Sequence, residues 1–257
     1  MNRLIRFCLG AVTLCAAGAA GVAIAGYGRR DALAAVVTGC ALNYHLSGKA
    51  FPCLAVHPGR DDPAYALLRP LGNRYEVLLT ATVAIPGIES LAIRPGNGSA
   101  FWQDAWLARD YVAAAIGRRD MPRDSVALAL NSAPARSQDR MHIHIDCLGA
   151  ANREAFVRQR AAITEAWSEF PEKLEGRLFW VRSVAGADLT DINPIALMLD
   201  GIPVAADDPA SMTLAVIGAT LADGRPGFYL VAETATPAID DGTGSAEDLL
   251  DHACRGY

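Results

Sequence analysis

His142 and His144 are the residues whose type and spacing point most directly to chemistry. They lie in the segment Met-His-Ile-His-Ile-Asp-Cys, residues 141–147. Its alternation of polar and apolar residues predicts a β-strand, whose side chains point to the two faces of a sheet in turn. His142, His144 and Asp146 then share one face that need not be buried, and the apolar residues between them face the core. Two imidazoles therefore stand side by side where a ligand can reach them.

A neutral imidazole is a good nucleophile toward phosphorus and forms a phosphoramidate that water can later cleave. The polar loop just upstream, residues 132–140, adds groups that bind phosphate. Donors on Ser137 and Gln138 can stabilise charge on non-bridging oxygens, and the guanidinium of Arg140 can hold phosphate oxygens in a bidentate fork. Asn131 ends the preceding strand and either bonds the phosphates or makes a turn. This set is typical of phosphoryl or nucleotidyl transfer without an obligatory metal or other cofactor.

Two other interpretations of the same strand remain open. Histidines two residues apart on a strand are also a common pair of metal ligands, and Asp146 is the third ligand at hand. Alternatively, the two histidines lie on an exposed strand face and have no role, because short motifs also match by chance.

The segments around this strand predict a chain of mixed α and β elements. Apolar runs rich in Val, Leu and Thr predict strands, and apolar residues at helical spacing predict helices. Asp-Gly and Pro-Gly pairs within 223–227 predict a hairpin between the last two strands. Strands with segregated helices imply one α+β domain, residues 31–257, with a mostly antiparallel sheet. The expected strands are 65–68, 75–85, 126–131, 141–147, 178–181, 212–217 and 228–232, and the expected helices are 31–40, 101–117, 152–167 and 246–254.

The composition limits the class of protein. Hydrophobic residues make up 52% of the 257 residues and charged residues 20%, which excludes disorder as the main state. The formal net charge is −5, so no basic surface for nucleic acid is expected. The chain is long enough for one sizeable core, and no repeat period indicates a solenoid or a fibre.

An uncharged N-terminal run indicates export. The 22 residues from 7 to 28 lie between Arg6 and Arg29 and contain no charged side chain. As a helix, at about 1.5 Å per residue, the run just spans a hydrocarbon core of ~30 Å. Residues 1–28 are therefore predicted to form a retained single-pass membrane anchor. The alternative is a signal peptide that is cleaved at the small-x-small sequence Ala-Ile-Ala, residues 23–25. Both interpretations export the rest of the chain.

Cysteine use agrees with export, because disulfides persist in oxidising compartments. Four of the six cysteines lie outside the apolar run: Cys40, Cys53, Cys147 and Cys254. An even number predicts two disulfides, for which three pairings exist. Cys40 and Cys53 flank a short polar loop that is easily closed, which leaves Cys147 to pair with Cys254. The alternative is four buried thiols, and no spacing typical of a zinc site is present.

The histidine strand and the residues before it resemble a known signature. Met-His-Ile-His-Ile-Asp-Cys, preceded by Ser-Gln-Asp, is similar to the histidine-triad (HIT) motif. It resembles more closely the bacterial CDP-diacylglycerol pyrophosphatases, a membrane-bound branch of HIT-like enzymes. The resemblance covers nearly the whole chain, more thinly across 150–210. Supporting matches are the N-terminal apolar segment, the early cysteine pair, Gly-Ile-Glu-Ser at 87–90, Phe-Trp-x-x-Ala-Trp-x-Ala-Arg-Asp at 101–110, Leu-Asn-Ser at 130–132 and Asp-His-x-Cys at 251–254.

This resemblance implies a fold and an activity. The fold would be a HIT-like, mostly antiparallel sheet with flanking helices, held in the bacterial inner membrane by one N-terminal transmembrane helix, with the catalytic domain on the periplasmic side. The substrate would be the membrane lipid CDP-diacylglycerol, cleaved at its pyrophosphate to CMP and phosphatidate through a histidine–nucleotidyl intermediate. No cofactor and no nucleic acid are implied, and no protein partner is indicated. The rival interpretation is a non-catalytic periplasmic module that binds nucleotides or lipids on the same fold.

Individual residues also receive roles from the resemblance. In HIT enzymes the middle histidine of the triad is the nucleophile; that position is His142 here, and His144 is the third histidine. A shift of register would instead make His144 the nucleophile. The first position holds Arg140, a departure from the full triad, since an arginine cannot accept a hydrogen bond from a neighbouring imidazole. Arg140 either binds phosphate or is a solvated loop residue.

Overall fold

The computed structural model describes residues 29–59, 63–94, 97–235 and 243–257. The predicted N-terminal transmembrane helix, residues 1–28, lies outside these ranges. Of the helices within them, none combines the length and the apolar character that crossing a membrane requires.

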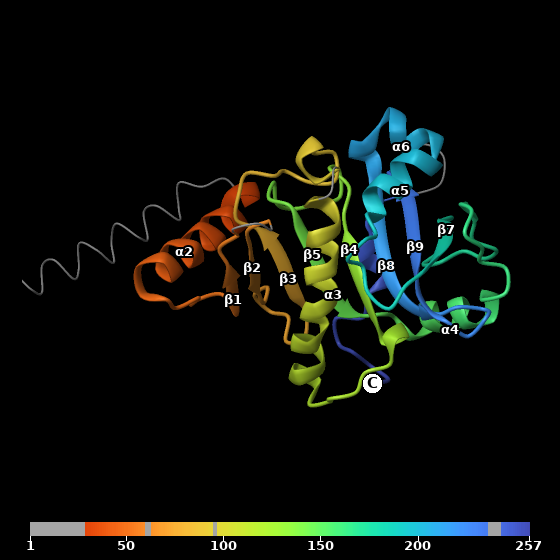
Figure 1. Ribbon diagram of the computed structural model, residues 1–257, viewed down its shortest axis with the longest axis horizontal. Helices are drawn as coiled ribbons and strands as arrows, with labels where there is room; N and C mark the ends of the chain where they lie inside the picture. The colour runs from red at the N-terminus through yellow and green to blue at the C-terminus, as the bar shows by residue number, and fades with distance from the viewer. Residues whose placement is uncertain (1–28, 60–62, 95–96, 236–242) are drawn as a thin grey trace, which may run out of the picture.

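A single antiparallel sheet organises the described chain (Figure 1). Its nine strands run in the order β1-β2-β3-β5-β4-β8-β9-β7-β6, and every neighbouring pair is antiparallel. The predicted α+β class with a mostly antiparallel sheet is thereby confirmed, and so is the predicted hairpin, formed by β8 and β9. The strands are β1 Ala55–His57, β2 Tyr65–Leu68, β3 Val77–Ala81, β4 Val126–Leu130, β5 His142–Cys147, β6 Ser168–Glu169, β7 Trp180–Ala185, β8 Met212–Thr220 and β9 Pro226–Thr234.

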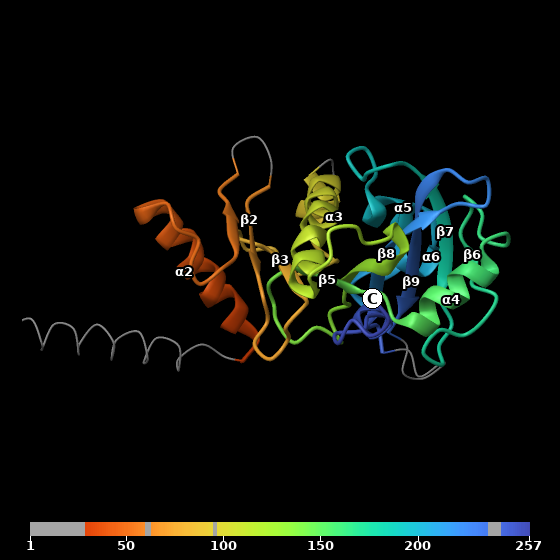
Figure 2. The same ribbon diagram turned by 90° about the horizontal axis from the view of Figure 1, so that it is seen from below.

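Helices cover both faces of the sheet (Figures 1 and 2). The main core lies between the sheet and α3, where Trp102 and Trp106 are almost fully buried, and it extends under α5 and α6. On the other face α4 packs through Phe156 over β4, β8 and β9. A third, smaller core lies under α2, which covers the β1–β2 end of the sheet. The helices are α2 Ala32–Ser47, α3 Asn97–Ile116, α4 Ala150–Gln159, α5 Pro194–Gly201 and α6 Pro203–Asp207.

The histidine strand β5 lies near the middle of the sheet, between β3 and β4. Its alternation is as predicted, because Ile143 and Ile145 belong to the main core while the polar residues point to the other face. The expectation that the polar face need not be buried is wrong, since His142 and His144 are only 6% and 7% exposed and Asp146 is 0% exposed. The C-terminal segment, residues 246–254, lies against this face and shields it from bulk water.

Both predicted disulfides are present, Cys40–Cys53 and Cys147–Cys254. The second one joins the end of β5 to the C-terminal segment across 107 residues of sequence. It thereby fixes the segment that covers the polar face of β5.

Several predicted helix boundaries differ from the structure. The helix expected at 31–40 continues to Ser47, and the one expected at 152–167 runs instead from Ala150 to Gln159. The terminal helix expected at 246–254 is a single 3-10 turn, Ala246–Leu249. Beyond it the carboxylate of Asp251 accepts hydrogen bonds from the following backbone, at residues 253 and 255, in place of helical carbonyls. Periodicity predicted neither α5 nor α6, which together span few residues.

Candidate active site

His142 begins β5 and is held by one hydrogen bond. Its Nδ1 lies 2.6 Å from the carbonyl oxygen of Arg140. A carbonyl can only accept, so Nδ1 carries the proton and Nε2 presents its lone pair. Burial, and secondarily the neighbouring His144, lowers the pKa of His142 to about 4. The ring is therefore neutral at pH 7 and has the tautomer that a nucleophile needs, and no hydrogen bond from the described residues engages Nε2.

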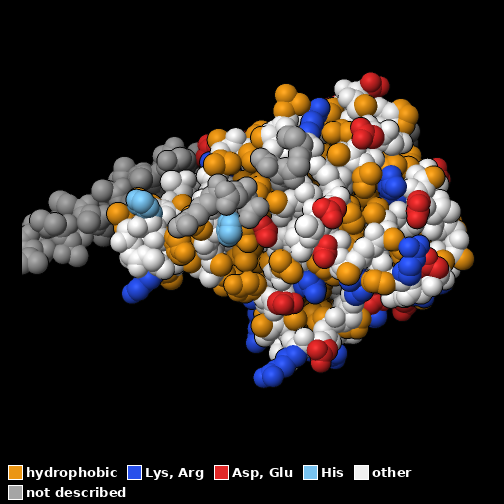
Figure 3. Space-filling view, in the orientation of Figure 1, with side chains coloured by type: hydrophobic (Ala, Val, Ile, Leu, Met, Phe, Trp, Pro, Cys, Tyr) orange, Lys and Arg blue, Asp and Glu red, His pale blue; other side chains and the backbone are white. Residues whose placement is uncertain are grey.

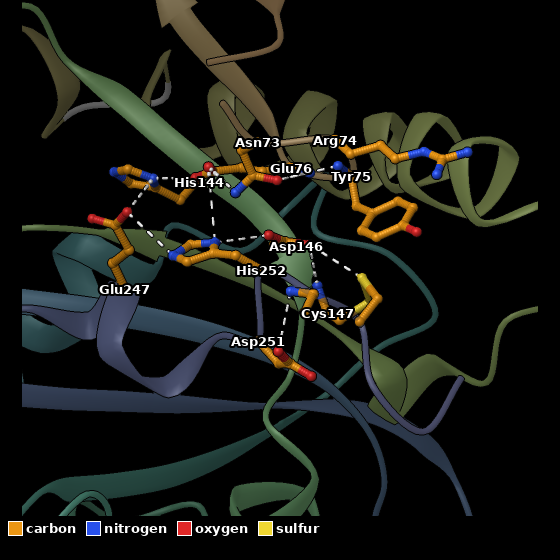
Figure 4. A network of polar contacts seen from close by, with 12 residues as sticks. Asn73, Arg74, Tyr75, Glu76, His144, Asp146, Cys147, Glu247, Asp251 and His252 are labelled. Atoms are coloured by element: carbon orange, nitrogen blue, oxygen red, sulfur yellow. Dashed lines mark hydrogen bonds and ion pairs between the residues drawn. A yellow bond between two sulfur atoms is a disulfide. The ribbon is translucent and has the colours of Figure 1, made fainter. Parts of the chain in front are cut away.

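The second imidazole, His144, packs edge to face against the first, with ring centroids 4.9 Å apart. Its Nδ1 lies 2.5 Å from the carboxylate of Glu76 and 3.3 Å from that of Glu247 (Figure 4). Its Nε2 is buried and has no hydrogen-bond partner within the described ranges. Because a buried ring nitrogen without a partner is costly, this atom is suited to bind a ligand.

A third histidine joins the site from the C-terminal segment. Nδ1 of His252 lies 2.9 Å from Asp146 Oδ2, and its Nε2 lies 3.6 Å from Glu247 Oε1 (Figure 4). The hydrogen bond to Asp146 is the main cause that raises the pKa of His252 to about 9. His252 is therefore cationic at pH 7, and it offsets part of the charge of the carboxylates around it.

Amide side chains hold the two glutamates in place. Asn73 Nδ2 donates to Glu76 Oε2 at 2.8 Å, and Asn73 Oδ1 accepts from the backbone N–H of Glu76. Asn131 makes the same pair of contacts with Glu247, through its Nδ2 at 2.8 Å and its Oδ1 at 3.2 Å. Each carboxylate that faces His144 is thus fixed by an asparagine that also binds its backbone.

His142 and His144 line a cavity of about 670 Å³ between the sheet and α2. The cavity has a polar side and an apolar side, and the strand register explains why. Leu68 of β2 pairs with Leu78 of β3, which pairs with His144 of β5. Polar groups therefore lie over β5 and leucines over β3 and β2. Helix α2 closes the apolar side with Leu33 and other residues.

The predicted site residues are brought together with one exception. Five of them line the cavity, namely Asn131, Ser137, Gln138, His142 and His144. Gln138 also accepts a hydrogen bond from the backbone N–H of Leu33, near the start of α2. Arg140 is not among the lining residues. Its guanidinium donates to the carbonyl of Thr82 instead, so the cavity gives no support to its predicted phosphate contact.

Sequence reasoning did not find Glu76, Glu247 or Arg69. Arg69 lines the cavity, and its guanidinium donates to the carbonyls of residues 74, 75 and 111, which fixes a cation there. One signal was available for His252. The predicted Cys147–Cys254 disulfide brings the residues just before Cys254 next to Asp146.

Among the described residues, three groups each bring three potential metal-ligand atoms together, but one of them, Asp146, Cys147 and Cys254, has its cysteines joined in a disulfide, which leaves two groups. They are Glu76, His144 and Glu247, and Glu76, Asp146 and His252. His142 belongs to neither group. The set of His142, His144 and Asp146 considered from the sequence is therefore not assembled as a metal site in the described chain.

Comparison with known proteins identifies the family of this chain. The model of the family described as CDP-diacylglycerol pyrophosphatase matches residues 28–256. The chain belongs to the CDP-diacylglycerol pyrophosphatase family. A protein of Yersinia pestis named CDP-diacylglycerol pyrophosphatase is 33% identical over 205 residues, which cover 79% of this chain and 76% of that protein. The family resemblance predicted from residues 131–147 is confirmed, and with it an enzyme of phospholipid metabolism that hydrolyses CDP-diacylglycerol.

Proposed function

We propose that this enzyme cleaves CDP-diacylglycerol in two steps on a HIT-like fold, with His142 as the nucleophile. Nε2 attacks the phosphorus next to the cytidine, a nitrogen–phosphorus bond forms, and the bond from that phosphorus to the bridging oxygen breaks, so that phosphatidate leaves. Water then attacks the same phosphorus, Nε2 departs and CMP is released. The observation that carries the proposal is the Nδ1–H···O=C bond to residue 140, which leaves the Nε2 lone pair available in a neutral ring.

The same hydrogen bond accounts for the arginine at the first triad position. Residue 140 supports the nucleophile through its backbone carbonyl, which every amino acid possesses. An arginine there does not remove the contact that orients His142. The departure from the full triad therefore gives little support to a non-catalytic binding module.

His144 is proposed to bind the non-bridging oxygens of the attacked phosphate through Nε2. Glu76 and Glu247 face its Nδ1, and an anionic pyrophosphate would face its Nε2. Ser137 and Gln138 line the same cavity and are proposed to donate further hydrogen bonds to phosphate oxygens.

A trapping experiment tests the nucleophile. The full chain is mixed with CDP-diacylglycerol labelled in the cytidine, quenched within one turnover and examined for label bound to protein. Wild type should carry acid-labile label, His142→Ala should carry none and lose turnover, and His144→Ala should be impaired but still labelled. Label on His142→Ala and none on His144→Ala would identify His144 as the nucleophile. CMP release without any labelled protein would favour direct attack by water.

The compartment is part of the same proposal. We infer that the catalytic domain is exported to the periplasmic side of the inner membrane and that residues 1–28 are retained as its anchor. Two disulfides in the domain support an oxidising compartment. Membrane fractionation, together with sequencing of the mature N-terminus, distinguishes an anchor from a cleaved signal peptide.

A further inference from the structure

Helix α2 is unusual for a helix at the surface of a domain, because its 16 residues include no Asp, Glu, Lys or Arg. Its inner side packs on the sheet through Leu33, Val37 and Cys40. On the outer side Leu42 and Leu46, one turn apart, are 57% and 75% exposed. Surface helices normally carry charged residues on the solvent side, whereas the exposed side of α2 carries these leucines beside polar residues such as Thr38 and His45 and has no Asp, Glu, Lys or Arg.

Neighbouring loops extend this apolar surface. Phe51, in the loop that follows α2, is 77% exposed, and the Cys40–Cys53 disulfide holds that loop against the helix. Leu71, in the turn between β2 and β3, is also exposed. Apolar side chains are visible around α2 in the space-filling view (Figure 3). We call the set Val36, Leu42, Leu46, Phe51, Leu54 and Leu71 the α2 surface.

The α2 surface is continuous with the active-site cavity. Val36 and Leu71 belong to the surface and also line the cavity. From this mouth the lining continues inward over Leu68 and Leu78 to His144. An apolar path therefore leads from the outside of α2 to the proposed phosphate position.

The lipid substrate gives this path a use. Each methylene group that moves from apolar surroundings into water lowers the partition constant by a factor of about four. An acyl chain of many methylene groups therefore does not cross an aqueous gap between bilayer and enzyme at a useful rate. The uncharged run of 22 residues ends at residue 28, just before the turn Arg29–Asp31 that leads into α2. Any bilayer that this run enters would lie close to α2.

We propose that the α2 surface docks on a lipid bilayer, so that the acyl chains of the substrate pass from the bilayer into the cavity between α2 and the sheet. This inference rests on the lipid substrate of the proposed function and not on the histidine intermediate. It assigns to α2 a role in reaching the substrate that is separate from the chemistry at His142.

A local probe of depth tests the docking. Leu46→Trp in the full chain places an indole on the α2 surface, and Val157→Trp places one on α4, where Val157 is 49% exposed at the far end of the sheet (Figure 1). With phosphatidylcholine vesicles that contain brominated acyl chains, the added emission of Leu46→Trp should be quenched and that of Val157→Trp should not. Quenching of neither variant while the protein floats with the vesicles would overturn the proposal. So would a blue-shifted, unquenched emission of Leu46→Trp without vesicles, since another protein segment or copy would then cover α2.

Kinetics separate this proposal from the chemistry. Leu42→Asp combined with Leu46→Asp should lower CMP release from long-chain CDP-diacylglycerol in vesicles by about tenfold or more, because two apolar contacts with lipid are lost. The same variant should cleave a short-chain, water-soluble CDP-diacylglycerol at the wild-type rate, and Val157→Asp should leave both rates unchanged. If the double variant and wild type cleave the long-chain substrate in vesicles at equal rates, the docking is refuted. If wild type carries no label that depends on His142, the proposed chemistry is refuted and the quenching result still stands.

Discussion

Glu76→Gln tests whether His144 acts through a charged partner. Glu76 is 3% exposed, and its Oε1 lies 2.5 Å from His144 Nδ1. Glutamine keeps the shape but removes the charge, and its NH₂ group cannot accept the hydrogen bond from Asn73 that Oε2 accepts. Hydrogen bonds to charged groups contribute about 1.5–3 kcal/mol, which corresponds to a fall of about 10- to 150-fold in kcat. KM should change much less, because the Glu76–His144 hydrogen bond mainly stabilises the charge that develops during phosphoryl transfer.

The assay is CMP release at saturating substrate, with thermal melting to confirm that the variant is folded. Glu172→Gln is the matched control, because Glu172 is paired with Arg158 and Gln159 near α4, at the opposite end of the sheet. It should stay within about twofold of wild type, as surface ion pairs contribute little. Glu76→Gln combined with His144→Ala should be no slower than His144→Ala alone, since Glu76 acts through that ring. A folded Glu76→Gln enzyme with wild-type kcat, or fully additive losses, would refute the reasoning.

Four further predictions follow from the same contacts. The pKa of His252 is raised to about 9, so its contribution to the free energy of unfolding is full below pH ~6.5 and is lost as the pH rises through about 9. Because the side chain is 43% exposed, we expect this contribution to be about 1 kcal/mol. Urea titration at a series of pH values should show the loss in wild type and not in His252→Gln. Replacing Cys147 and Cys254 by serine should destabilise the domain by up to about 4–5 kcal/mol for a loop of this length. It should also lower kcat, because this disulfide holds the segment that carries His252. A loss of stability in denaturant titration without a loss of kcat would contradict this prediction. Arg140→Ala should keep CMP release within about fivefold of wild type, because the carbonyl remains; a loss as large as that of His142→Ala would show that the guanidinium binds substrate. EDTA should leave the rate unchanged, and a loss that zinc restores would assign a metal to the glutamate–histidine cluster.

Local chemistry along the chain made much of the fold predictable. The alternation in residues 141–147 predicted the two faces of β5, and the apolar face lies in the main core as expected. The four cysteines outside the apolar run predicted both disulfides, because only one pair flanks a short loop. Helix lengths were less predictable. The terminal helix expected at 246–254 is mostly absent, and the Asp251 carboxylate accepts hydrogen bonds from the backbone N–H groups of residues 253 and 255 in its place.

The sequence by itself determined which residue types could attack phosphorus, where they stand along the strand and which family the chain belongs to. It could not show that the polar face of β5 is buried, because the covering residues come from the far end of the chain. Glu76 and Glu247 contact His144 from two separate segments, and Asn131 holds Glu247 from a third, so no spacing along the sequence encodes these contacts. Only the tertiary structure decided these partners, since burial and the distance between charges depend on how the strands pair and where the C-terminal segment is tied down.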